Sequence, residues 1–131
     1  MMLVRARIDK SPIHGLGLFS VDALPEGTKV WEFTPGYDQS FSPGDIDPLS
    51  EASKEQFFNY AYTSKITGNY ILCTDDARFF NHDPNSNITC TVPEDSTHPE
   101  ALVCYTTRDV SAGEEITNDY REFDSDPSDV M

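Results

Sequence analysis

Three short segments of the sequence combine residue types that bind ligands or take part in catalysis. The first contains Gly15 and Gly17, and glycines allow a backbone to turn sharply or to approach a ligand closely. The second, residues 78–87, places His82 among amide side chains and beside aromatic ones. The third, residues 113–120, predicts a turn and a strand that ends on Tyr120. Together they offer backbone groups, an imidazole, amides and a phenol hydroxyl to a ligand.

The glycine pair does not match the two common phosphate-binding loops. It lacks the third glycine and the long helix of a dinucleotide-binding fingerprint, and it lacks the Lys-Ser/Thr of a phosphate loop. Taken alone, it predicts only a turn or a close approach of the backbone to another group.

The second segment also overlaps a calcium-loop pattern. Acidic or amide residues stand at positions 1, 3, 5 and 12 of that pattern, namely Asp83, Asn85, Asn87 and Glu94. Ile88, however, occupies the sixth position, where the sharp turn requires glycine. Pro84 and Pro93 lie inside the loop, and neither flank has a helical period. The sequence therefore argues against calcium binding.

In this order, the three segments resemble the SET-domain family of protein lysine methyltransferases. That family has a glycine pair followed by Leu-Phe, then R-F-x-N-H-S-C-x-P-N, then G-E-E-L-T-x-D-Y. The resemblance extends from about Arg5 to Phe123, and the compact form is similar to small, stand-alone viral and bacterial members. Residues that match the second and third motifs are Arg78, Phe79, Asn81, His82, Asn87, Gly113, Glu114, Glu115, Thr117, Asp119 and Tyr120.

The resemblance implies a mainly β, SET-domain fold. We expect several small curved β-sheets, a knot-like threading of the C-terminal segment and one or two short helices. The domain is expected over residues 1–123. Residues 124–131 are acidic and contain no base, so we expect a frayed tail there.

The resemblance also implies S-adenosyl-L-methionine as cofactor, with no metal. Tyr120 is then the catalytic residue that holds the lysine amine. Cofactor-binding roles fall on Gly15, Leu16, Gly17, Arg78, Asn81 and His82. Methyl transfer from a sulfonium is an in-line displacement, so positioning and a desolvated site supply most of the rate enhancement. The lysine, with a pKa of about 10.4, must first lose a proton, and an apolar channel favours that loss.

An aromatic channel for the lysine needs further side chains. The candidates are Tyr60, Tyr62, Tyr70, Tyr105, Asn118 and Phe123. Each aromatic residue among them has a packing role in the core as its alternative. Asn118 stands where the family usually has Phe or Tyr, so it is expected either to bind a channel water and limit the number of methyl groups or to cap a loop.

Two other departures from the family pattern concern the second motif and the chain end. Residues 83–86 read Asp-Pro-Asn-Ser in place of Ser-Cys-x-Pro. No cysteine follows Cys104, so the cysteine-rich zinc segment that closes the lysine channel in many eukaryotic members is absent from this sequence. Phe123 is a candidate to cover the channel mouth instead.

Short strands are the main elements predicted to position these residues. Alternating or β-rich runs stand at residues 2–8, 18–21, 28–33, 70–74, 88–92, 102–106 and 114–117. Tight turns are expected at residues 24–27 and 109–113, and a loop over residues 35–50. One short helix is expected through about Tyr60, capped by Ser50 or by Ser53, which begins a capping-box pattern.

The balance of acidic and basic residues limits the classes of molecule that the protein is expected to bind. The chain has 131 residues, nine of them basic and 23 acidic, for a formal charge of −14. Few bases can neutralise phosphates, so we expect no nucleic acid, which also disfavours a metal nuclease built on His82, Asp75 and Asp76. A negative field attracts cations, so the expected substrate is a basic, histone-like or ribosomal-like protein or peptide. The alternative is a catalytically silent module that binds a basic partner. A homodimer is also compatible with the sequence.

The three cysteines and the hydropathy pattern indicate where in the cell the protein is expected. Cys73, Cys90 and Cys104 are odd in number and have no C-x-x-C spacing, so we expect reduced, buried thiols. No apolar run approaches 18 residues, and residues 1–10 lack the apolar stretch of a signal peptide. With no basic import cluster, a cytoplasmic protein without membrane association is expected.

Overall fold

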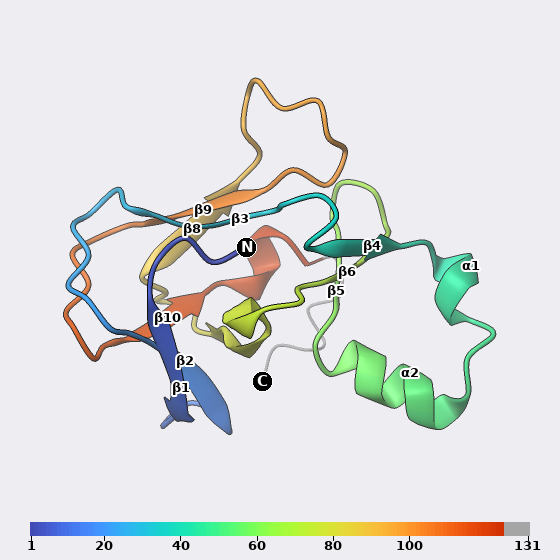
Figure 1. Ribbon diagram of the computed structural model, residues 1–131, viewed down its shortest axis with the longest axis horizontal. Helices are drawn as coiled ribbons and strands as arrows, with labels where there is room; N and C mark the ends of the chain where they lie inside the picture. The colour runs from blue at the N-terminus through green and yellow to red at the C-terminus, as the bar shows by residue number, and fades with distance from the viewer. Residues whose placement is uncertain (125–131) are drawn as a thin grey trace.

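The computed structural model describes residues 1–124, and most of its regular elements are short strands. They form one four-stranded and two three-stranded sheets, with few and short helices (Figure 1). The mainly β fold of several small sheets is therefore confirmed.

The four-stranded sheet joins the two ends of the sequence. Across the sheet its strands are β1 (Ala6–Lys10), β2 (Leu16–Ser20), β10 (Glu115–Asn118) and β7 (Asn81–His82). β10 runs antiparallel to β2 and parallel to β7. Leu18 and Ile116 are direct partners across β2 and β10, and neither is exposed, so this pair anchors the sheet in the core.

The first strand begins later than its apolar alternation predicts. Met2 and Val4 do pack against the core, but Met2 makes only an isolated bridge to Trp31. Ladder pairing with β2 starts at Ala6 and continues to Lys10, which leaves Ile8 exposed. The hairpin with β2, rather than the apolar pattern, sets the bounds of β1.

A second sheet packs its inner face on the same core. Its strands are β3 (Lys29–Glu32), β9 (Val103–Thr106) and β8 (Ile88–Thr91), in that order. Val30 and Ile88 are fully buried in it. Both turn units predicted from the sequence meet here, because Leu24 and Val110 form a bridge with hydrogen bonds of 2.8 Å in each direction.

The third sheet and the helices form the other end of the molecule, at the right of Figure 1. The strands are β4 (Gln39–Phe41), β6 (Tyr70–Leu72) and β5 (Tyr62–Thr63), and the helices are α1 (Pro43–Ile46) and α2 (Glu51–Phe58). The expected loop over residues 35–50 is thus partly wrong, because three- and four-residue elements leave no readable period. Ser50, not Ser53, caps α2 by accepting from the Ser53 backbone N–H. Among residues 1–124 no helix is long and apolar enough to cross a membrane.

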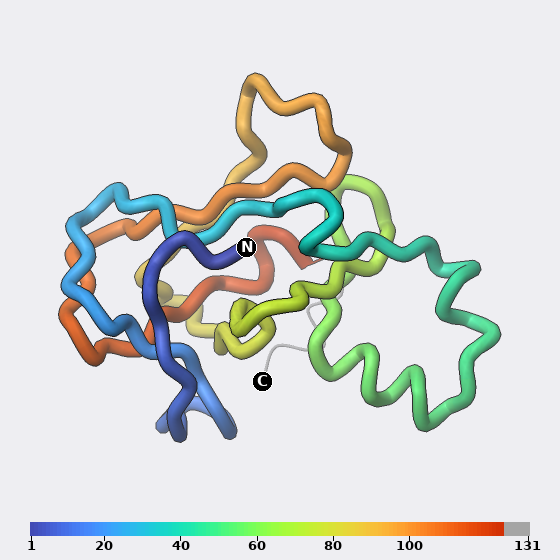
Figure 2. Tube along the Cα trace, in the orientation of Figure 1, coloured from blue at the N-terminus to red at the C-terminus, as the bar shows by residue number. Residues whose placement is uncertain are grey.

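The C-terminal segment passes through the middle of the molecule, as the red part of the trace in Figure 2 shows. After β10 it forms the 3-10 helix η2 (Tyr120–Glu122) and then reaches the loop after β5. There Lys65 donates its backbone N–H to the Phe123 carbonyl, and Asp124 forms a bridge with Ser64. Asp124 is 2 % exposed, so the expected frayed tail does not begin at that residue; residues 125–131 lie outside the described part of the chain.

One expectation about the cysteines is wrong. Cys90 on β8 and Cys104 on β9 are direct cross-strand partners, with Cα atoms 4.0 Å apart, and they form a disulfide. Sequence spacing could not reveal this pair because only the strand register brings the two residues together. Cys73 is a buried free thiol, as expected, and burial raises its pKa. Reduced cysteines were one reason to expect a cytoplasmic protein, and that reason no longer holds.

Candidate active site

β10 brings the three chemistry-bearing segments together. Its Ile116 is the partner of Leu18 on β2, directly after the glycine pair. On its other side, Thr117 and Asn118 are the partners of Asn81 and His82 on β7. Tyr120 follows two residues after the end of this strand. The site is therefore built where β2, β10 and β7 run side by side.

Asn81 holds the glycine segment in place. Its side chain is buried, and Nδ2 lies 3.1 Å from the His14 carbonyl oxygen, 3.0 Å from that of Leu16 and 2.9 Å from Oε2 of Glu115. Two amide hydrogens are thus shared among three acceptors. The Leu16 side chain is 48 % exposed, so this residue enters the site through its backbone.

Glu115 is a site residue that sequence reasoning matched to the motif without giving it a role. Its carboxylate accepts from the Ser11 hydroxyl at 2.8 and 2.9 Å, in addition to Asn81. A Cβ atom on Gly17 would lie 2.4 Å from Glu115 Oε2, so a side chain at this position would force the Glu115 carboxylate to move. Gly15 meets no such neighbour, but its φ of +46° is left-handed and favours glycine. The second Glu of the Gly-Glu-Glu motif was the available signal.

His82 links β7 to the catalytic candidate. Its Nδ1 accepts the backbone N–H of Tyr120 at 3.1 Å, and the two rings lie 5.3 Å apart. Oδ1 of Asp119 is 3.7 Å from the same nitrogen. Asp119 also accepts two hydrogen bonds from the Arg121 guanidinium, at 2.9 and 2.7 Å, which lower the pKa of the Asp119 carboxyl. Both contacts fix the backbone from which Tyr120 extends.

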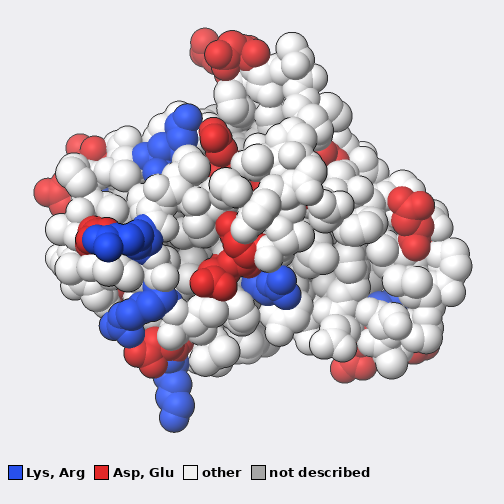
Figure 3. Space-filling view, viewed as in Figure 1, with Lys and Arg blue, Asp and Glu red and all other residues white. Residues whose placement is uncertain are grey.

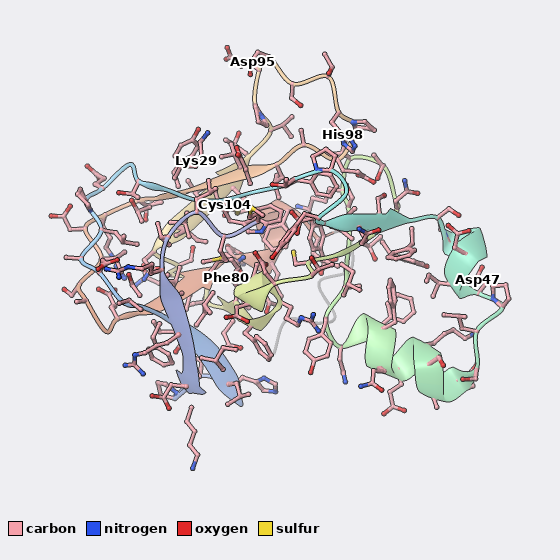
Figure 4. All side chains as sticks on the ribbon, viewed as in Figure 1. Lys29, Asp47, Phe80, Asp95, His98 and Cys104 are labelled. Carbon is pink, nitrogen blue, oxygen red and sulfur yellow. A yellow bond between two sulfur atoms is a disulfide. The ribbon has the colours of Figure 1, made fainter. Side chains whose placement is uncertain are left out.

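Tyr120 stands at one end of a row of aromatic rings. Its hydroxyl donates to the carbonyl oxygen of Phe80, the residue labelled at the centre of Figure 4. The ring of Phe123 is 5.9 Å from Tyr120 and 4.9 Å from Tyr62, edge-on in both cases. Burial raises the pKa of Tyr62 well above its ordinary value, so this phenol is neutral. Tyr62 and Phe123 are therefore the channel candidates that the structure joins to Tyr120.

The remaining aromatic candidates have other neighbours. Tyr60 is 38 % exposed and stacks under the Arg78 guanidinium at 5.2 Å. Tyr70 packs against Phe57 and Phe58 of α2, and so attaches that helix to the third sheet. Tyr105 lines a separate cavity between β3, β9 and residues 93–102. None of these contacts involves Tyr120.

Asn118 has an unsatisfied polar atom at the end of β10. The residue is 4 % exposed, and its Oδ1 has no hydrogen-bond partner among residues 1–124. Its backbone carbonyl accepts from Asp83, which ties the residue after β7 to β10. A buried amide oxygen without a donor costs free energy, which is typical of a functional position.

The calcium-loop pattern has a structural explanation. Asn87, its central residue, is 1 % exposed, and its amide nitrogen donates to Glu114 and to the Glu115 carbonyl oxygen. Its amide oxygen accepts the Thr117 backbone N–H. These bonds attach the segment before β8 to β10, so Asn87 has a positioning role. Within residues 1–124 no group of three or more His, Cys, Asp or Glu side chains could hold a metal ion.

Comparisons with known proteins agree with this arrangement. The SET domain family matches residues 15–121. A protein of Plasmodium falciparum (isolate 3D7), named "Putative histone-lysine N-methyltransferase 1", is 28 % identical over 122 residues. The match covers 90 % of this chain and 2 % of that protein, so the chain spans a small part of its relative.

A crystal structure of a "putative histone methyltransferase" of Plasmodium falciparum has the same fold. It superposes with a TM-score of 0.63 at 17 % identity, over 91 % of this chain and 95 % of the other. The family match covers most of the chain and includes the glycine pair, Asn81, His82 and Tyr120. This chain belongs to the SET-domain family.

Proposed function

We propose that this protein transfers a methyl group from S-adenosyl-L-methionine to a lysine side chain of a basic protein. One observation carries the proposal: β10 joins the Asn81-held glycine segment to Tyr120 and to the Tyr62–Phe123 ring pair. A cofactor site and an aromatic amine site then share one strand.

The groups around Asn81 fit the charge of this cofactor. The carbonyl oxygens of His14 and Leu16 and the Glu115 carboxylate all accept from the Asn81 amide nitrogen, and each has lone pairs beyond the one used there. Acceptors of this kind suit the ammonium group and the sulfonium of S-adenosyl-L-methionine. Residues 15–17, Asn81 and His82 would hold the cofactor, which supplies an activated methyl group when bound.

Tyr120 would orient the attacking amine. Its hydroxyl hydrogen points to the Phe80 carbonyl oxygen, and a hydroxyl oxygen that donates can also accept an N–H bond. An amine held in this way presents its lone pair in a fixed direction, and correct alignment of reacting atoms accounts for large rate factors. Tyr120 thus acts through position rather than as a base.

The rings of Tyr62 and Phe123 would prepare the amine by removing water from it. Burial among apolar rings disfavours the charged ammonium, which lowers the pKa of the lysine and releases its proton. We infer that Asn118, whose Oδ1 is buried without a donor, binds an N–H or a water in the same region and limits how many methyl groups are added.

The net negative charge of the chain supports a basic protein as the proposed substrate. The chain carries −14 overall, and on the face shown in Figure 3 the Lys and Arg side chains lie mainly on the side of β1 and β2, while acidic side chains are spread over the whole face, including the end with α1 and α2. Such a field would steer a basic protein or peptide, histone-like or ribosomal-like, toward the site. Methylation rates on a basic peptide should therefore fall as salt rises, whereas a salt-independent rate would exclude steering.

A catalytically silent module that binds a basic partner is the second candidate. It is favoured by one observation, that the Asn81 amide nitrogen already has three acceptors inside the chain. Calorimetric titration with S-adenosyl-L-methionine separates the two candidates. Saturable binding that weakens in an Asn81→Ala variant supports the enzyme, and no heat of binding up to millimolar cofactor supports the silent module.

A further inference from the structure

A cavity of about 240 Å³ lies against the side of the Tyr62–Phe123 pair, and Tyr120 does not line it. Liquid water occupies about 30 Å³ per molecule, so a cavity of this volume has room for several water molecules or for one long side chain. Two carboxylates, Glu100 and Glu122, line it together with these aromatic rings. The cavity is therefore next to the proposed amine site without being part of it.

Glu100 is a buried carboxylate whose charge is not neutralised. It is 4 % exposed, and it accepts from the Ser40 hydroxyl at 2.6 Å, from the Thr67 hydroxyl at 2.7 Å and from the Asn69 amide at 3.2 Å. These donors, and the Ser64 side chain that also hydrogen-bonds Glu100, are neutral. No ion pair in residues 1–124 includes Glu100. Burial opposes ionisation, but these hydrogen bonds outweigh it and hold the pKa of Glu100 below its usual value.

The protein holds this carboxylate firmly in place. Glu100 precedes β9 at the base of a projecting loop on which Figure 4 labels Asp95 and His98, and its backbone N–H donates to Nδ1 of His98. Its donors come from β4 and from the loop between β5 and β6. Neutral donors occupy its lone pairs without cancelling its charge, so Glu100 gives the cavity a fixed negative charge.

The other charged groups of the cavity leave it negative. Glu122 lies at the exposed rim, where it accepts from the Thr89 hydroxyl at 2.6 Å. Lys65 is the one basic side chain among the lining residues, and its ammonium donates to the Arg121 carbonyl oxygen. Two carboxylates against one ammonium favour a cationic guest. The acidic residues 125–131 contain no base that would supply it.

We propose that this cavity binds a second basic side chain of the substrate, close in sequence to the lysine that is methylated, with Glu100 and Glu122 as its counter-charges. The inference rests on the proposed function and adds a sequence preference to it. The Tyr62–Phe123 pair separates the two amine sites: the methylated lysine lies on the Tyr120 side, and the flanking Lys or Arg lies on the Glu100 side.

The test uses labelled peptides with one central lysine and either arginine or its neutral isostere citrulline at each flanking position. Peptide binding is measured by fluorescence anisotropy, and methyl transfer by mass spectrometry. We expect one flanking position at which arginine improves binding by about tenfold, as a charge-assisted hydrogen bond does. Glu100→Gln should reduce this preference to less than about twofold.

Two further variants separate an effect of the cavity from a general effect of net charge. Ile66→Trp narrows the cavity from its exposed lining residue and leaves the hydrogen bonds of Glu100 intact, so it should also reduce the preference. Glu51→Gln removes an equal charge from α2, where the side chain is 95 % exposed, and should leave the preference unchanged.

An arginine preference that persists in both cavity variants, or peptides that do not bind, would overturn the inference. Methyl transfer without any flanking preference would overturn it while leaving the proposed function intact. A preference in binding that depends on Glu100, without methyl transfer to any peptide, would instead overturn the proposed function and retain the cavity as a basic-peptide site.

Discussion

Gly17→Ala should destabilise the protein because of Glu115. The new Cβ would lie 2.4 Å from Oε2 and 2.9 Å from Cδ of Glu115, and 3.0 Å from Cβ of Ser11. Because the first two contacts are too short, the carboxylate must move and weaken its bonds to Ser11 and Asn81. Overpacking costs roughly 1–3 kcal/mol and each weakened hydrogen bond about 1 kcal/mol, so we expect a loss of about 3 kcal/mol in the free energy of unfolding.

A double-mutant cycle with Glu115→Ala tests this explanation. In the Glu115→Ala background the carboxylate is gone, so Gly17→Ala should cost less than about 1 kcal/mol, and the two sites should be coupled by about 2 kcal/mol. Urea unfolding of the four proteins gives the cycle. Gly15→Ala serves as control: its Cβ meets nothing, and its cost of about 1 kcal/mol from the left-handed φ should be the same in both backgrounds.

If Gly17→Ala costs the same with and without the Glu115 carboxylate, the close contact does not explain the glycine. The cost would then come from the remaining contact within the chain, the Ser11 Cβ at 3.0 Å. Thermal melting gives an independent check, because 3 kcal/mol corresponds to a shift of about 10 °C in a domain of this size.

Three further predictions concern the site and its scaffold. Tyr120→Phe should lower kcat by about 100-fold or more while cofactor affinity by calorimetry changes only a few-fold, because the ring stays and only the aligning hydroxyl is lost; retention of half the activity would contradict this role. Asn118→Phe should shift products toward higher methylation in mass spectra, because it removes the buried Oδ1; an unchanged product distribution would mean that Asn118 does not face the channel. Replacing Cys90 and Cys104 by Ala should lower the free energy of unfolding by about 3 kcal/mol, the value for a loop of this length, relative to Cys73→Ala assessed in the same urea series.

Local patterns in the sequence predicted the elements that depend on neighbouring residues. The α2 helix and both tight turns were found, and Gly27 and Gly113 have the positive φ angles, 84° and 85°, that such turns need. Three- and four-residue elements such as β4 and α1 escaped prediction, since they are too short to show a period. Their positions depend on tertiary partners.

The sequence likewise did not show which residues of the site contact one another. The motifs named Asn81 and Tyr120, but the contact of Asn81 with Glu115 depends on the register of β10 between β2 and β7. The Cys90–Cys104 disulfide likewise depends on the register of β8 and β9. Sequence patterns therefore identify side chains that carry chemistry more readily than the partners that hold them.

Mass spectrometry of a basic protein incubated with this chain and S-adenosyl-L-methionine tests the proposed methyl transfer most directly. A histone mixture serves as substrate, and Tyr120→Phe serves as the matched control. We expect a mass increase by whole methyl groups, located on lysine side chains by fragmentation, and its near loss with the variant. The proposal would be contradicted if the lysines stay unmodified although calorimetry shows that the wild-type protein binds the cofactor. Equal methylation by the wild-type protein and the variant would also contradict it.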